Sequence, residues 1–71
     1  MRFVKDTQGD LWNLDHIAVI FKSKPEDLQS SIYKVKATLA STSEKIVLFE
    51  GIENRCDIFI YNLERLANEL N

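Results

Sequence analysis

The sequence ENRCDIFIYNLERLANELN, residues 53–71, decides the fold of this chain. Apolar side chains recur in it at steps of three and four residues, which places them on one face of a helix. These residues are Cys56, Phe59, Ile60, Leu63, Ala67 and Leu70, with Leu66 at the border. The pattern predicts one amphipathic helix over about 54–70. Such a helix buries its apolar face against another layer, so the preceding residues are expected to form a sheet.

Short strands joined by turns are predicted before the helix. Residues 2–5 and 11–14 form a hairpin around residues 6–10, which are rich in turn formers. Residues 31–39 alternate apolar and polar side chains, and residues 45–50 are a further β-branched and aromatic run. Apolar residues change parity after position 14, which predicts a bulge or small turn there.

Together these segments predict a single α+β domain over residues 1–71, with strands within 2–50 and the closing helix. We expect a strongly curled antiparallel sheet of four to five strands with the helix packed across it. A split barrel akin to a pleckstrin-homology-like domain is one version of this arrangement.

Two predicted strands carry apolar residues on both faces. Residues 17–21 are apolar at five consecutive positions, and residues 46–49 are apolar at four. A strand with one face in water alternates instead. Because one helix covers only one side of a sheet, the other side needs a cover, which is either a fully curled sheet or a second copy of the protein.

Composition and charge limit the classes of function. The formal net charge is −2 and the sequence pI is about 5.2, which gives little support for the basic face that nucleic-acid binding normally requires. The single cysteine cannot form an internal disulfide, which favours a reducing compartment. Neither an apolar leader nor a stretch long enough to span a membrane is present in the sequence. We expect a soluble cytoplasmic protein.

The candidates for catalysis are few. Asp15 and His16 are adjacent, but neighbours on an extended chain point to opposite faces, and no Ser or Cys motif accompanies them. Cys56 lies on the apolar stripe, which favours a buried, inert thiol over a reactive one. His16, Cys56, Asp10 and Asp57 lack the spacing of metal ligands. We expect a non-enzymatic protein with no catalytic residue, cofactor or metal site.

Two groups of residues are candidates for binding. Lys22, Lys24, Lys34 and Lys36 would form a small basic patch if their strands pair, or they are simply solvated or guard a sheet edge. Ile58 and Tyr61 lie off the main helix stripe and either widen it or form a homodimer or partner contact. With Ile17, Val19 and Phe21, they make up the expected interface.

The chain resembles a group of small uncharacterised bacterial and phage proteins that have an opening strand, an N-L-D-x-I turn-strand, two further strands and a closing helix. The matching residues are Asn13-Leu14-Asp15-His16-Ile17, then 45–51, 53–56 and 61–63. The resemblance implies the fold and carries over no site.

Our leading hypothesis is a small protein-interaction module that self-associates. The alternative is nucleic-acid or regulatory-RNA binding through the four lysines.

Overall fold

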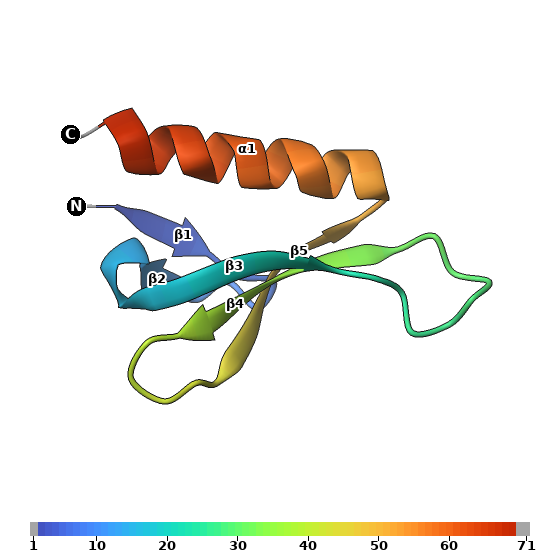
Figure 1. Cartoon of the computed structure of the whole chain (residues 1–71), viewed down its shortest axis with the longest axis horizontal. Helices are drawn as coiled ribbons and strands as arrows, with labels where there is room; N and C mark the ends of the chain where they lie inside the picture. The colour runs from blue at the N-terminus through green and yellow to red at the C-terminus, as the bar shows by residue number, and fades with distance from the viewer. Residues whose placement is uncertain (1, 70–71) are drawn as a thin grey trace.

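The computed structural model describes residues 2–69 and shows an α+β chain with a C-terminal helix, as the sequence predicts (Figure 1). A short 3-10 helix, η1, accompanies the strands. In chain order the elements are β1 (Phe3–Lys5), β2 (Leu11–Asn13), η1 (Leu14–His16), β3 (Ile17–Ser23), β4 (Tyr33–Leu39), β5 (Lys45–Gly51) and α1 (Glu53–Glu69). Leu70 of the predicted stripe lies outside the described residues.

The five strands form two antiparallel sheets, so the expected single sheet of four to five strands is wrong. The first sheet is the β1–β2 hairpin, and the second has the order β3-β4-β5. The parity change after position 14 is η1, which turns the chain between β2 and β3, so that these consecutive strands do not pair. The hairpin reaches β5 instead, where the Thr7 N–H donates to the Val47 carbonyl at 3.1 Å. The sheet is not closed, and it gives no support to a pleckstrin-homology-like barrel.

Two bulges explain why β3 and β5 carry apolar residues at successive positions. The β3–β4 ladder shifts register between Ile17 and Val19, which leaves Ala18 as the extra residue. The β4–β5 ladder shifts in the same way, with Leu48 as the extra residue between Val47 and Phe49. An extra residue restarts the alternation of side chains. The bulges therefore account in part for the runs of consecutive apolar residues. Such runs do not require that both faces of each strand be covered.

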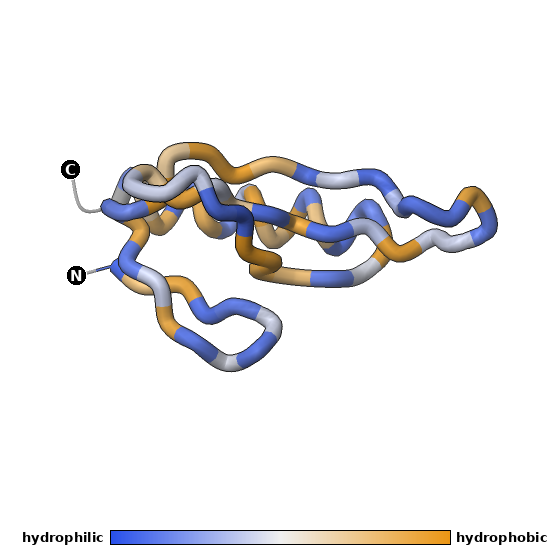
Figure 2. Tube along the Cα trace, turned by 90° about the horizontal axis from the view of Figure 1, so that it is seen from below, coloured by the Kyte–Doolittle hydropathy of each residue, from blue (hydrophilic) through white to orange (hydrophobic). Residues whose placement is uncertain are grey.

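The core lies between α1, the hairpin and one face of the three-stranded sheet. Its fully or almost fully buried members are Val4, Val35, Ala37, Leu48 and Cys56. The rings of Phe49 and Phe59 stack at their margin, with centroids 4.9 Å apart and an angle of 14° between planes. Figure 2 views the molecule from below, with the sheet in front of the helix. The opposite face of the sheet has no layer packed on it among residues 2–69.

Polar contacts hold the hairpin in place. The guanidinium of Arg2 donates from Nη1 to the Ala67 carbonyl of α1 at 2.6 Å. In the turn, Gly9 has a φ of 90°, a conformation that glycine adopts without steric cost. The indole Nε1 of Trp12 donates to Asp6 Oδ2 at 2.7 Å. This hydrogen bond, followed by those from nearby backbone N–H groups, lowers the pKa of Asp6 below its ordinary value of 3.8.

The Asp6 carboxylate makes the hairpin sensitive to acid. A carboxylate whose pKa is lower in the folded than in the unfolded state stabilises the fold above its unfolded value, and that stability is lost as the pH falls through the folded value. We therefore expect the free energy of unfolding to decrease below about pH 4. Asp6→Asn should weaken this dependence. Urea titrations between about pH 2 and pH 6, followed by Trp12 fluorescence, measure it. Equal pH slopes for the two proteins would contradict the prediction.

Candidate interaction surfaces

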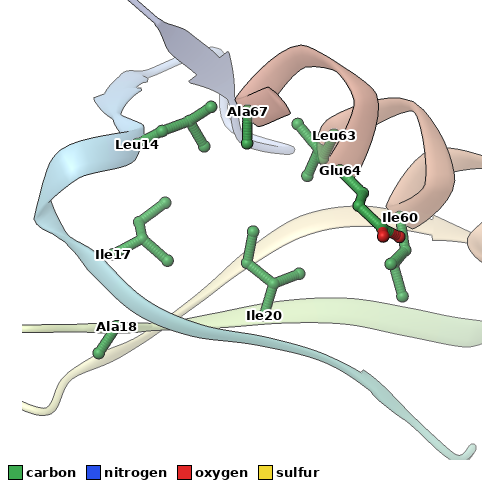
Figure 3. A pocket seen from close by; sticks show the side chains of 8 residues that line it. All are labelled: Leu14, Ile17, Ala18, Ile20, Ile60, Leu63, Glu64 and Ala67. Carbon is green, nitrogen blue, oxygen red and sulfur yellow. The ribbon is translucent and has the colours of Figure 1, made fainter. Parts of the chain in front are cut away.

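An apolar groove runs between β3 and α1, and Figure 3 shows its walls. Its volume is about 350 Å³. Leu14, Ile17 and Ile20 point into it from one side, and Leu63 and Ala67 face them from the helix. Ala18, Ile60 and Glu64 complete the lining, so a single carboxylate lies among aliphatic side chains. The groove lies where α1 runs along β3: Lys22 near the end of β3 contacts the first turns of α1, whereas Ile17 at its start lines the groove with Ala67.

The strand beside this groove has a free edge. The order β3-β4-β5 leaves one side of β3 without a strand partner within residues 2–69. Natural edge strands are usually protected by lysine, proline or a bulge. In β3 the bulge at Ala18 and the charge of Lys22 lie toward the two ends, and the residues between them, Val19, Ile20 and Phe21, are all apolar. This middle section is open to strand pairing.

The sheet face that points away from α1 forms a second surface. In β3, Phe21 pairs with Lys36 of β4, which pairs with Val47 of β5. A neighbouring row across the sheet consists of Val19, Thr38 and Lys45. Val19 is 54% exposed, and Lys45 Nζ lies 5.9 Å from the centre of the Phe21 ring. We call this surface the open face.

The expected cluster of four lysines does not form, because Lys22 lies on the other side of the sheet. Lys22 pairs with Val35, a core residue, and its side chain is on the helix side. Its Nζ lies 2.8 Å from both Glu53 Oε2 and Asp57 Oδ1. The hydrogen bonds that Lys22 Nζ donates to the carboxylates of Asp57 and Glu53 raise the pKa of Lys22. Lys22 thus joins β3 to the start of α1.

The remaining lysines lie near the open face, together with one that the sequence analysis missed. Lys24, Lys34 and Lys36 line a cavity of about 210 Å³ with the loop that follows β3, which contributes Glu26 and Asp27. Lys45 belongs to the same face because it pairs with Thr38. The short turn between β4 and β5 indicates a hairpin, and counting outward from it could have placed Lys45 opposite Thr38.

The residues of the expected interface lie on three different surfaces. Ile17 lines the groove, and Val19 and Phe21 lie on the open face. Ile58 and Tyr61 lie on the outer side of α1, where they are 49% and 58% exposed. No single flat contact can include all five. The groove residues Leu14, Ile20, Ile60 and Leu63 were assigned to the core or to strands from sequence, because a groove depends on how the helix packs beside the edge strand.

The other candidates lie apart from these surfaces. Asp15 and His16 are exposed in η1, and Asp15 Oδ1 lies 3.6 Å from Arg2 Nη2. Cys56 is fully buried, and its Sγ lies 3.6 Å from the Gly51 carbonyl oxygen. Burial raises the pKa of the Cys56 thiol. Across residues 2–69, no group of three or more His, Cys, Asp or Glu side chains is arranged to hold a metal ion.

Comparison with known protein families, curated proteins and solved structures found no match to this chain in any of the three. The resemblance to small bacterial and phage proteins stays a prediction. In the part of the chain that the structure describes, no helix is both long and apolar enough to cross a membrane.

Proposed function

We propose that this chain is a small non-enzymatic interaction module that self-associates through the edge of β3. The observation that carries the proposal is the free edge of a seven-residue strand beside an apolar groove. Adding a strand to an exposed sheet edge provides main-chain hydrogen bonds, and pockets for side chains provide the selectivity. The groove between β3 and α1 is such a pocket.

A second copy is the partner that fits this edge, because the strand is complementary to itself. Two β3 strands related by a two-fold axis run antiparallel, and the same patch then covers itself. With the axis beside Ile20, the central residue of β3, each Ile20 side chain meets its counterpart on the helix side. On the open face, Val19 of one copy lies next to Phe21 of the other. The pairing joins the three-stranded sheets of the two copies into one sheet of six strands.

This arrangement also covers the apolar groove beside the β3 edge. The two grooves come to lie on the same side of the joined sheet, with one helix on each flank. The aliphatic side chains of Ile17, Ile20 and Leu63 then lose water, which favours association by about 25 cal/mol per Å² of apolar area. Exposed apolar residues on the outer side of α1, such as Tyr61, take no part in this contact.

Sedimentation equilibrium across micromolar concentrations tests the proposal. We expect a concentration-dependent shift from the 8.2 kDa monomer to twice that mass. Ala18→Arg places a long cation on the free edge and should raise the dimer dissociation constant more than about tenfold, because each copy then brings a charge to the contact. The matched control is Ala40→Arg, at an exposed residue in the turn after β4, which should dimerise like the parent.

Three results would overturn the proposal. A monomer at the highest concentration excludes self-association altogether. A dimer that Ala18→Arg leaves intact excludes the β3 edge as the contact. A dimer that is lost in Tyr61→Glu, with an unchanged circular dichroism spectrum, places the contact on the outer side of α1.

A further inference from the structure

The open face has an ordered arrangement of side chains, of which self-association at the β3 edge involves only Val19 and Phe21. Strand pairing aligns its residues in three rows across β3, β4 and β5. One row is Val19, Thr38 and Lys45, the next is Phe21, Lys36 and Val47, and the third is Ser23, Lys34 and Glu50. Three lysines on the two neighbouring strands thus share a face with the Phe21 ring, and Lys45 Nζ lies 5.9 Å from the centre of that ring.

Among the strand residues of the open face, positive charges outnumber negative ones. On the strands of the open face there are three lysines and one acid, Glu50, whose Oε2 lies 4.0 Å from Lys34 Nζ. The first helical turns, on the other side, carry Glu53 and Asp57, which bind Lys22. The strand residues of the open face therefore carry a positive excess, although the chain as a whole is negative.

The acids near this face lie in two groups. Glu26 and Asp27 line a cavity together with Lys24, Lys34 and Lys36, and Asp27 Oδ1 accepts a hydrogen bond from the Gln29 N–H. Asp6 and Asp10 line a cavity together with Lys45. The Asp6 carboxylate accepts hydrogen bonds from the Trp12 indole and from the backbone N–H groups of Gln8 and Asp10. Lys36 has Phe21 and Val47 as its cross-strand neighbours, so its ladder partners on the sheet face carry no charge.

We infer that the open face binds single-stranded nucleic acid. A base stacks on the partly exposed ring of Phe21, and the ammonium groups of Lys34, Lys36 and Lys45 bind the phosphates on either side. Binding to single strands without sequence preference combines these two elements, an aromatic platform and a positive surface that follows the backbone. Stacking needs an unpaired base, so a duplex is disfavoured.

The affinity of one copy is expected to be modest, because three lysines neutralise few phosphates and Glu50 offsets part of their charge. Each phosphate contact with a single strand contributes about −0.7 to the slope of log K against log salt, so three contacts give a slope of about −2. Loss of the stacking ring should weaken binding about tenfold.

Fluorescence anisotropy with a labelled oligouridine of about 12 nucleotides, at low salt, tests the inference. Lys36→Ala and Phe21→Ala should each weaken binding, and Phe21→Trp should preserve it. The matched control is Lys22→Ala, because it removes the same charge from the residue next to Phe21 but on the helix side of the sheet. Lys36 lies on β4, so Lys36→Ala leaves the β3 edge intact and separates this inference from self-association.

Several outcomes decide the matter. Weaker binding for Lys36→Ala, with parental binding for Lys22→Ala, supports the inference. Equal losses in the two lysine variants would mean attraction to net charge alone and would overturn it. Absence of binding at about 100 μM protein in low salt overturns it as well. Binding of an acidic peptide that is as tight as that of oligouridine, and insensitive to Phe21→Ala, would make the open face a protein contact instead.

Discussion

Phe59→Ala is expected to lower the free energy of unfolding by about 3 kcal/mol, which is a large part of the stability of a chain of this size. The Phe59 ring stacks on Phe49 and packs against the buried cluster below α1. Removing it leaves a cavity and exposes the neighbouring Phe49 ring. Urea denaturation followed by circular dichroism measures the shift of the midpoint.

The adjacent residue on the helix provides the control for this prediction. Ile58 is 49% exposed, so Ile58→Ala should change the free energy of unfolding by less than about 1 kcal/mol. If both variants unfold at the same urea concentration, the face of α1 that carries Phe59 does not contribute to the core. Leu63→Ala should behave like Phe59→Ala, because Leu63 packs on the same cluster.

The second large effect concerns the thiol of Cys56, which should react with a disulfide reagent at least about a hundredfold more slowly in the folded than in the unfolded chain. Cys56 is fully buried, so the reagent reaches it only when the structure opens. The raised pKa of the thiol lowers the fraction of thiolate, which is the reactive form. Both effects act in the same direction.

The reaction rate is measured by the absorbance of the thiol that the disulfide reagent releases when it reacts with Cys56. The reference rate comes from the same chain in concentrated urea, where the thiol is accessible. Phe59→Ala should increase the reaction rate of Cys56 in the folded chain, because it lowers the free energy of opening. Comparable rates in the folded and unfolded chains would show that Cys56 is accessible, and would reopen the possibility of a reactive cysteine.

The helix was the most predictable part of the fold. Its apolar residues keep helical spacing over about four turns, and local spacing of this kind does not depend on any other element. The α+β class followed from it, and the β1–β2 hairpin was correct because Gly9 and its neighbours form a turn in any context. Cys56 was placed in the core for the same reason as Phe59, since both lie on the stripe.

The strand arrangement was less predictable, because pairing is non-local and a bulge changes which face each side chain occupies. Lys22 shows the difficulty. From sequence it was expected on the same face as Lys36. Only the register of the ladder shows that Phe21, and not Lys22, lies opposite Lys36. The separation into two sheets depends on η1, a single 3-10 turn. Its signal in the sequence was only the change in parity of the apolar residues after position 14.

The candidate surfaces were predictable in part. An exposed Tyr61 and an apolar β3 follow from the sequence, whereas the groove depends on how α1 packs beside β3. The open face requires register as well, because Lys34, Lys36 and Lys45 come together only through two ladders. These are properties of the assembled sheet and have no signature within one segment.

The two bulges differ in what they imply for the length of related chains. Ala18 is the extra residue of β3 and is exposed, so a chain lacking it keeps the pairing of Ile17 with Leu39 and of Val19 with Thr38. Leu48 is the extra residue of β5, but it is 3% exposed and belongs to the core. Its loss would leave the ladder intact and the core one side chain short. We therefore expect some related chains to lack the residue at position 18, and all of them to keep an apolar residue at position 48.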